Sequence, residues 1–471
     1  MENGVRRPHI AVLPTPGMGH LFPLAELAKL LVHRHHFTIT FITFAASDNS
    51  ATQAFLSTLP SSITSVALPP VPLDDIPDGA TIETRMSIVT LRSLPSLRTV
   101  LLDLQSTTNL VAFLADFFAA DGFHIARELG ILYYMFIPSN LQFLTVMFEL
   151  PALDAAIKCE FPELEEPVRL PGCVPIPGPE ILTPLRNRST EEYKWMLHHA
   201  ALYRQAQGIL VNSFVAIEPG PAKILTSEEQ GRPPVYPVGP MIQARSAAGA
   251  EGAACLRWLD EQPAGSVIFV SFGSGGTLSR KQLWELAMGL EQSKQRFLWV
   301  VRSPCDEDSS STYFTASTKE NPLSYLPEGF TERTKEVGLV VPSWAPQIDV
   351  LGHAATGGFL SHCGWNSTLE SVAHGVPMIA WPLFAEQTMN AVMLAEAVRI
   401  AIRPVAGEDG FFYRGEIARV VRELMEGEQG KAVRNRVWLL KEAAGAALSE
   451  EGSSLKALDE VAAKWKSFKA V

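Results

Sequence analysis

The sequence predicts an α/β fold with two domains, each built on a doubly wound parallel sheet of the Rossmann type. The chain has 471 residues, which is more than one hydrophobic core usually supports. In both halves, apolar runs of strand length alternate with stretches of helical spacing, and such runs indicate parallel sheets covered on both faces. A stretch rich in Ala, Gly and Pro separates the two alternations, so we expect the domain boundary there.

The first alternation occupies residues 1–240. An apolar strand at 9–13 ends in a turn rich in Pro and Gly, and a helix with periodic apolar positions from Leu21 follows. Thr, Ile and Phe dominate the next strand, at 37–44. Further buried strands are expected at 110–118, 131–137 and 208–212.

The second alternation occupies residues 266–450, after a linker that we place at 241–265. It opens with a buried strand at 266–272. Later strands are expected at 296–301, 338–342, 357–361, 377–380 and 400–404. The segment 451–471 contains a last helix, because Leu455, Leu458, Val461 and Trp465 recur at helical spacing.

The composition excludes several classes of protein. A net charge of −11 argues against a nucleic-acid-binding protein, which needs clustered Lys and Arg. The five cysteines are far apart and form no C-x-x-C pair, which favours reduced thiols in the cytoplasm. No run of 18 apolar residues and no signal peptide are visible, so we expect a cytoplasmic monomer without a membrane span.

Two histidines follow predicted strands directly. His20 ends the turn Gly17-Met18-Gly19 after the first strand, and His362 follows the strand at 357–361. Ligands of open parallel sheets collect beyond the carboxyl ends of the strands, so the two histidines could meet across one cleft. A histidine with a near-neutral pKa is suited to take a proton from an attacking hydroxyl group, which makes His20 a candidate base.

The densest group of functional side chains lies at 344–387. Trp344 follows a strand and offers a flat face for stacking on a base. The run from His362 to Ser367 turns a strand into a helix, whose N-terminus can bind an anion. Glu370 lies one turn further, and the adjacent Glu386 and Gln387 suit recognition of vicinal sugar hydroxyls.

This region resembles the signature box of plant secondary-product glycosyltransferases, the family 1 UDP-glycosyltransferases. The likeness extends over essentially the whole chain, and segments 13–20 and 271–279 resemble the hydroquinone glucosyltransferases (arbutin synthases) of that family. It implies the GT-B fold, in which two Rossmann-like domains face each other and the last helix returns to the first domain. It also implies an inverting transfer of glucose from UDP-glucose to a small phenol, without a metal or other cofactor.

The resemblance also implies roles for single residues. Trp344 would stack on uracil, Ala345 would bind its edge through the backbone, and Gln347 would hold the nucleoside. The diphosphate would be bound around the start of the helix, with a further contact after the first strand of the second domain, by His362, Trp365, Asn366, Ser367 and Ser274. Glu370 would bind the ribose. The hexose would be contacted by Glu386, Gln387 and Ser139, with Glu386 standing where many members have Asp.

The family pairs its catalytic histidine with an aspartate that orients the imidazole. Asp116 and Asp121 both follow the strand that begins at residue 110. The comparison with the family pattern favours Asp121 as the partner of His20, although Ala119 and Ala120 replace the usual small polar pair. Asp116 is the alternative.

Other enzyme signatures are incomplete. Phe22 occupies the position where a dinucleotide-binding fingerprint needs glycine, and no phosphate-binding P-loop is present. The run Asp306-Glu307-Asp308 lies in a Ser-rich stretch, so we expect a solvated loop and not a metal site. Two alternatives remain, a Rossmann-type nucleotide-sugar epimerase or oxidoreductase and a non-catalytic UDP-sugar binding protein.

The acceptor is expected to be a flat aromatic molecule, such as a hydroquinone, a monolignol or a flavonoid. The residues expected to shape its pocket are mostly apolar, which suits a broad class of such molecules. They are Phe117, Phe118, Phe143, Met147, Phe148 and Pro184.

Overall fold

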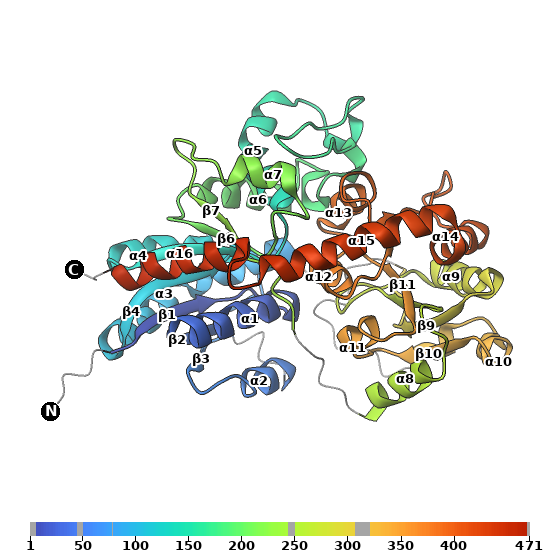
Figure 1. Cartoon of the computed structure of the whole chain (residues 1–471). Helices are drawn as coiled ribbons and strands as arrows, with labels where there is room; N and C mark the ends of the chain where they lie inside the picture. Colours follow the sequence, from blue (N-terminus) through green and yellow to red (C-terminus); the bar gives the residue numbers. More distant parts are fainter. Residues whose placement is uncertain (1–5, 45–49, 78, 244–249, 307–320, 469–471) are drawn as a thin grey trace. The chain divides into compact units, whose positions relative to one another are not determined.

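The computed structural model describes residues 6–44, 50–77, 79–243, 250–306 and 321–468 (Figure 1). Contacts divide the chain into two units. Unit 1 comprises Met1–Pro179, Pro184–Ile242 and Ala446–Val471, and unit 2 comprises Glu180–Thr183 and Gln243–Gly445. Each unit contains one parallel sheet with helices, which confirms the predicted α/β class and the two Rossmann-like sheets.

The sheet of unit 1 has seven strands in the order β3-β2-β1-β4-β5-β6-β7, all paired in parallel. The chain builds outward from β1 on one side and from β4 on the other, so the strand order reverses between these two neighbours. Ligands of doubly wound sheets bind at such a switch point. The strands are β1 Pro8–Leu13, β2 Thr38–Phe44, β3 Ile63–Leu68, β4 Asn109–Asp116, β5 Leu132–Ile137, β6 Ile209–Val211 and β7 Val235–Pro237.

The helices of unit 1 follow the apolar periodicity of the sequence. In α1 (Met18–His35), Leu21, Leu24, Leu27 and Leu31 form one buried stripe against the sheet. The other helices are α2 Ser50–Leu56, α3 Ile82–Thr107, α4 Phe123–Glu128, α5 Leu141–Ala156, α6 Glu191–Tyr203, α7 Pro219–Leu225 and α16 Ser453–Ser467. A 3-10 helix, η2 (Phe117–Gly122), directly follows β4.

The sheet of unit 2 has six strands in the order β10-β9-β8-β11-β12-β13, again all parallel. Its strand order reverses between β8 and β11. The strands are β8 Val267–Ser271, β9 Arg296–Val301, β10 Gly338–Pro342, β11 Thr356–Ser361, β12 Met378–Ala380 and β13 Ala401–Ile402. The helices are α8 Ala250–Asp260, α9 Arg280–Ser293, α10 Phe330–Thr334, α11 Gln347–Leu351, α12 Trp365–His374, α13 Gln387–Val392, α14 Arg414–Glu426 and α15 Glu428–Ala447, the last ending beyond the unit boundary.

The structure adds elements that the pattern of the sequence did not predict. Strand β7 has only three residues and β3 is half exposed, so neither gives a long apolar run, and α8 lies inside the predicted linker. The predicted strand at 110–118 ends at Asp116, because the chain turns into η2 there. None of the described helices is long and apolar enough to cross a membrane.

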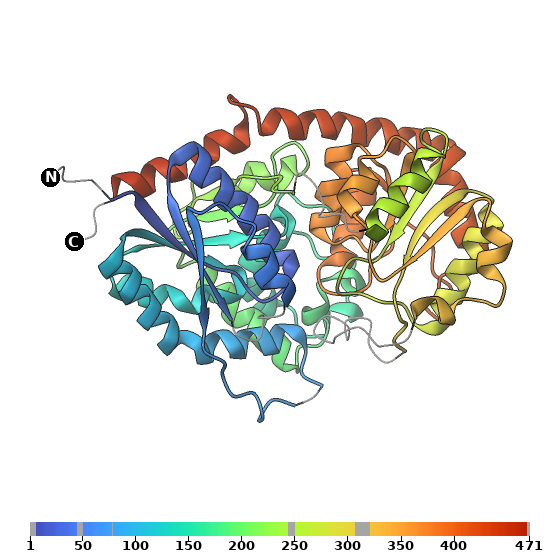
Figure 2. The same cartoon turned by 90° about the horizontal axis from the view of Figure 1, so that it is seen from below.

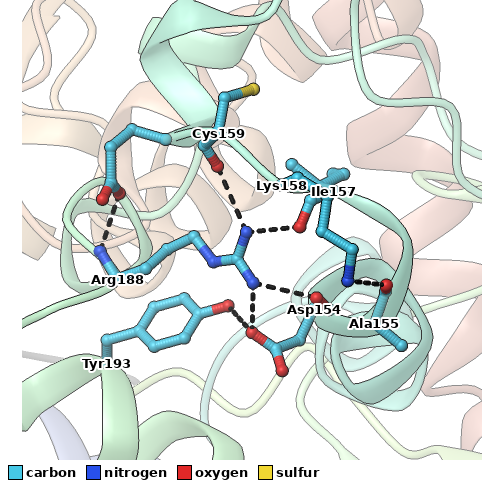
Figure 3. Close-up of polar contacts among 8 residues, drawn as sticks. Asp154, Ala155, Ile157, Lys158, Cys159, Arg188 and Tyr193 are labelled. Carbon is cyan, nitrogen blue, oxygen red and sulfur yellow. Dashed lines mark hydrogen bonds and ion pairs between the residues drawn. The ribbon is translucent and has the colours of Figure 1, made fainter.

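The segment after α5 is attached to unit 1 by Arg188 (Figure 3). Its guanidinium donates to the backbone carbonyls of Asp154 (2.8 Å), Cys159 (3.2 Å) and Ile157 and to the Asp154 carboxylate (2.7 Å). Tyr193 also donates to that carboxylate (2.7 Å), and both donors hold the pKa of Asp154 below its usual value. The network satisfies the Asp154 carbonyl in the last turn of α5 and two carbonyls of the chain just after the helix.

The C-terminal helix α16 is part of unit 1, where it lies against α1, β4 and β7 (Figure 2). Trp465 is the centre of this contact, because its side chain is fully buried. Its ring makes edge contacts with Phe37 and Tyr134, at centroid distances of 6.1 and 5.2 Å. The last helix therefore completes the core of the sheet that carries the N-terminal strands.

We expect Trp465→Ala to lower the free energy of unfolding of unit 1 by about 3–5 kcal/mol, the usual cost of emptying a large buried site. Trp438→Ala is the matched control, because Trp438 in α15 is 57% exposed and Trp465 is 0% exposed. Urea unfolding followed by circular dichroism measures both. Equal losses in the two variants would contradict the packing of α16 described here.

Candidate functional site

His20 lies in the first turn of α1, directly after β1. Gly17 precedes the helix with φ 121°, a backbone conformation that residues with a side chain rarely adopt. The Gly17 carbonyl accepts hydrogen bonds from the backbone N–H groups of His20 (3.1 Å) and Leu21 (3.2 Å). The glycine therefore allows the sharp turn that places the imidazole at the carboxyl end of β1.

Asp116 ends the neighbouring strand β4 and contacts this imidazole. The Nδ1–H of His20 donates to Oδ2 of Asp116 over 2.9 Å, and the backbone N–H of Thr15 approaches the same oxygen at 3.4 Å. Asp116 is fully buried, and the His20 side chain is 15% exposed. A proton held at Nδ1 leaves the lone pair of the imidazole at Nε2, the nitrogen that can act as a base.

The prediction that Asp121 is the partner of His20 is wrong. Oδ1 of Asp121 accepts a hydrogen bond from Nε2 of His198 on α6, over 2.8 Å. The physical reason is that β4 ends at Asp116. Leu13 of β1 pairs with Ala115, so Asp116 lies beside the residues that follow β1. Asp121 lies five positions further along, at the end of η2, and this short helix leads it toward α6.

Phenylalanine rings surround the imidazole of His20. The ring centroids of Phe117 and Phe118 lie 5.4 and 6.4 Å from it, and Phe143 of α5 packs 5.3 Å from Phe117. This side of the pair is therefore apolar, as predicted for an aromatic acceptor. Phe148, further along α5, packs under the guanidinium of Arg204 at 5.2 Å.

Ser139 follows β5, the next strand of the same sheet. Its side chain is buried, and its Oγ has no hydrogen-bond partner among the described residues. Because β4 and β5 are parallel neighbours, Ser139 belongs to the same edge of the sheet as Asp116.

In unit 2, the turn between β11 and α12 holds the imidazole of His362 between two glycines. A Cβ atom on Gly273 would come within 2.6 Å of Cε1 of His362, and one on Gly364 within 2.4 Å of Nε2. Burial, followed by the nearby charge of Arg302, lowers the pKa of His362 to about 4, so the ring is neutral at pH 7. Cys363, which lies between His362 and Gly364 in the sequence, adopts φ 65°, a conformation uncommon for a residue with a side chain.

Arg302 is a residue of this site that the sequence reasoning missed. It follows β9 and donates to the backbone carbonyls of Gly273 (3.1 Å) and Ser274. These contacts fix the turn that carries Ser274 after β8, beside the start of α12 at the switch point of the sheet. The signal that could have found it is its position at the carboxyl end of a strand next to β8.

Gln347, Ser367 and Glu370 form a hydrogen-bonded group. Nε2 of Gln347 donates to Oγ of Ser367 (2.9 Å) and to Oε2 of Glu370 (2.6 Å). Burial raises the pKa of Glu370 to about 7, and the bond from Gln347 opposes this shift. The carboxyl group of Glu370 is therefore near its titration midpoint at neutral pH.

The two tryptophans of the motif have different environments. Trp344 is 47% exposed, which leaves a ring face accessible to a planar ligand, and the neighbouring Ala345 is buried. Trp365 begins α12 with its side chain buried. The buried Trp365 side chain therefore packs under the turn between β11 and α12. Asn366 follows it in the first turn of the helix.

Glu386 and Gln387 stand at the start of α13. Oε1 of Gln387 accepts from the backbone N–H groups of Leu383 (2.9 Å) and Phe384 (3.1 Å), which directs the remaining amide group of this side chain. Residues 180–183 pack beside this turn, where the N–H of Thr183 donates to the carbonyl of Ala385 over 3.0 Å. The turn that carries Glu386 and Gln387 is therefore fixed by the Gln387 side chain and by the hydrogen bond from Thr183.

The acidic run that resembles a metal-binding motif gives no ligand set in the described part of the chain. Oδ1 of Asp306 accepts from the backbone N–H of Arg280 over 2.8 Å. Glu307 and Asp308 lie outside the described residues.

Comparisons with known proteins agree over nearly the full chain. Residues 236–409 match the family described as UDP-glucoronosyl and UDP-glucosyl transferase. The chain is 53% identical to hydroquinone glucosyltransferase from Rauvolfia serpentina over 461 residues, 97% of this chain and 98% of the relative. It is 52% identical to UDP-glycosyltransferase 72B1 from Arabidopsis thaliana over 468 residues, 98% of this chain and 97% of the relative.

Solved structures give the same result. A UDP-glucosyltransferase from Polygonum tinctorium that glucosylates indoxyl, determined in complex with 3,4-dichloroaniline, aligns with a TM-score of 0.92 and 51% identity, covering 99% of this chain and 100% of that one. UGT2 from Phytolacca americana, in complex with UDP-2fluoro-glucose and pterostilbene, aligns with a TM-score of 0.90 and 46% identity, covering 99% and 100%. These matches confirm the predicted GT-B fold.

The raised pKa of Glu370 predicts a pH-dependent cost of folding. The folded protein favours the protonated form of this carboxyl group. The stability gained from that preference is fully present below pH 4.5, the ordinary pKa of Glu, and is lost as the pH rises through about 7. Glu370→Gln keeps the acceptor for Gln347 and removes the buried charge. We expect the variant to be more stable than wild type at pH 8 by up to about 3 kcal/mol, and by much less at pH 5.

Urea unfolding at the two pH values measures this difference. Glu328→Gln, at an exposed position of unit 2, controls for the loss of one surface charge. A stability difference for Glu370→Gln that is the same at both pH values would contradict the buried environment of this carboxyl group.

Proposed function

The chain belongs to the UDP-glucoronosyl and UDP-glucosyl transferase family, and we propose that it transfers glucose from UDP-glucose to the hydroxyl group of small phenols. The single observation that carries the proposal is the hydrogen bond of 2.9 Å between His20 and the buried Asp116. This pair supplies a base for the acceptor, and the residues of unit 2 supply a site for the donor.

His20 would activate the acceptor. With its Nδ1 proton held by Asp116, Nε2 takes the proton of the phenol as the oxygen attacks the anomeric carbon. The bond from that carbon to the UDP oxygen breaks as the new bond forms, and UDP leaves with the electron pair. Attack opposite the leaving group converts the α-linked donor into a β-glucoside. The Asp116 carboxylate stabilises the imidazolium ion that results.

The switch point of unit 2 would bind the diphosphate. The N-terminus of α12 offers backbone N–H groups and the positive end of the helix dipole, which favour an anion. The neutral His362 ring can donate one N–H group, and Ser274, Asn366 and Ser367 add side-chain donors. These groups would also stabilise the charge that develops on UDP as it leaves.

The nucleoside and the sugar would lie on either side of the diphosphate. The exposed ring of Trp344 suits stacking on uracil, with the backbone of Ala345 at the base edge. Gln347 and Glu370, already joined by a hydrogen bond, suit the ribose hydroxyls. Glu386 and Gln387 suit the hexose hydroxyls, and the buried Oγ of Ser139 suits one more contact to the sugar. These assignments require no metal ion.

The acceptor would be a flat phenol such as a hydroquinone, a monolignol or a flavonoid. The rings of Phe117, Phe118 and Phe143 near His20 support this choice. The names of the similar proteins point the same way, because they include hydroquinone, indoxyl, 3,4-dichloroaniline and pterostilbene as aromatic partners. Product analysis with UDP-glucose against hydroquinone, a monolignol, a flavonol and a chloroaniline tests the proposal. Tight binding of UDP-glucose with no glucoside from any of them would favour a non-catalytic binding protein.

We expect His20→Ala to lower kcat for hydroquinone by about 10²-fold or more, because the general base is lost. The affinity for UDP, measured by calorimetry, should stay unchanged, since the proposed donor residues for UDP belong to unit 2. His33→Ala, at an exposed position of α1, is the control and should keep full activity. Loss of UDP affinity in His20→Ala would give His20 a structural role instead.

The two candidate aspartates should differ in their effect on the rate. Asp116→Asn should lower kcat about as strongly as loss of the base, since an amide at this position no longer holds the Nδ1 proton and no longer stabilises the imidazolium ion. Asp121→Asn should leave kcat within about twofold of wild type, as usual for a change away from the reacting groups. The reverse order of the two effects would restore Asp121 as the partner of His20.

A further inference from the structure

Asp121, His198 and His199 form a cluster that the proposed transfer reaction does not use. Asp121 lies in η2, one residue before its end, and the two histidines are adjacent on α6, all within unit 1. One ligand atom from each residue can be chosen so that all three lie within 4.8 Å of one another. Among the described residues, this is the only group of three His, Cys, Asp or Glu side chains with that property.

Two polar atoms of the cluster are buried without a hydrogen-bond partner in the described part of the chain. They are Oδ2 of Asp121 and Nδ1 of His199. Buried polar atoms are nearly always paired, so two such atoms in one small cluster indicate a missing partner. Both atoms are lone-pair donors, and a cation satisfies both at once.

The protonation state of His199 is fixed by its other nitrogen. The hydroxyl of Ser87 donates to the carbonyl of Glu83 over 2.7 Å, so its single hydrogen is already used. Ser87 Oγ must therefore accept from Nε2–H of His199, which lies 2.8 Å away. The lone pair of the ring then stands at Nδ1, the unpartnered atom. Metal-binding histidines are typically oriented by such a bond from the second nitrogen.

The two histidines of the cluster differ in exposure. His199 is fully buried, whereas the side chain of His198 is 41% exposed and its Nε2 is 2.8 Å from Oδ1 of Asp121. His198 gives the cluster an edge open to solvent, through which an ion can enter.

We propose that Asp121, His198 and His199 bind a divalent transition-metal ion of the Zn²⁺ type. Two imidazoles and one carboxylate are ligands that Zn²⁺ and Co²⁺ accept in a tetrahedral site, with water as the fourth ligand, whereas Mg²⁺ and Ca²⁺ prefer oxygen ligands alone. With bonds of about 2.0–2.2 Å, ligand atoms lie about 3.3 Å apart, so the side chains must shift by roughly an ångström.

The ion would join two elements that support the His20 pair. η2 starts directly after Asp116, and the ring of Phe118 in η2 contacts both imidazoles, with centroid distances of 6.4 Å to His20 and 5.4 Å to His199. A metal bond from η2 to α6 therefore stabilises the turn behind the proposed base. The ion itself takes no part in the transfer of the sugar.

Titration of the full-length, metal-free protein with Co²⁺ tests the site by visible absorption. We expect one equivalent of Co²⁺ to give the intense bands of a tetrahedral N/O site and Zn²⁺ to displace it. His198→Ala and Asp121→Asn should each weaken binding by about tenfold or more, as loss of a direct ligand should cost at least as much as loss of an outer-shell partner. The side chain of His198 is 41% exposed and that of Asp121 is 10% exposed, so circular dichroism checks that both variants fold.

His353→Ala is the matched control, because His353 also bonds an aspartate, Asp260, over 3.1 Å, without belonging to a three-ligand group in the described residues. It should bind Co²⁺ like wild type. Zn²⁺ should also raise the Tm of wild type and of His353→Ala but not of His198→Ala. The proposal is overturned if no Co²⁺ binds at one equivalent, if the bands show thiolate ligands, or if both cluster variants bind as wild type does. Transfer activity is a separate readout, so these results do not depend on the proposed function.

Discussion

The hydrogen bond between His20 and Asp116 is the interaction on which the account of this protein depends. It forms because β1 and β4 are parallel neighbours at the switch point of the unit 1 sheet, so that the residues after their carboxyl ends lie side by side. The burial of Asp116 in apolar surroundings makes this contact valuable, since the carboxylate has few other ways to be satisfied there. The Phe rings around the pair maintain that environment and also suit an aromatic acceptor.

Unit 2 uses the same principle for a different ligand. Its switch point lies between β8 and β11, and the turns after these strands carry Ser274 and His362. In unit 1 a hydrogen bond to an aspartate positions the histidine. In unit 2 two glycines position it, because a Cβ atom on Gly273 or Gly364 would collide with the His362 ring. Arg302 then fixes the first turn through two backbone carbonyls. The result is a rigid group of donors at the N-terminus of α12, which is the arrangement that binding of a diphosphate needs.

The sequence predicted those features that depend on local pattern. Apolar runs gave the two sheets, and the dense spacing of residues from Trp344 to Gln387 gave the candidate donor site. It favoured Asp121 over Asp116, which was wrong, because the choice depends on where β4 ends and on which neighbour each side chain reaches. The sequence also did not predict the role of Arg302, because a single arginine after a strand belongs to no motif. The pairing of Asp121 with His198 links residues 77 positions apart, a contact that no local pattern reveals.

The most direct test of the central claim is the NMR signal of the His20 Nδ1 proton in protein labelled with ¹⁵N-histidine. A proton held between imidazole and a buried carboxylate is shifted far downfield and is slow to exchange with water. We expect such a signal in wild type, its loss in His20→Ala and in Asp116→Asn, and its persistence in Asp121→Asn. A signal that survives in Asp116→Asn and disappears in Asp121→Asn would contradict the account.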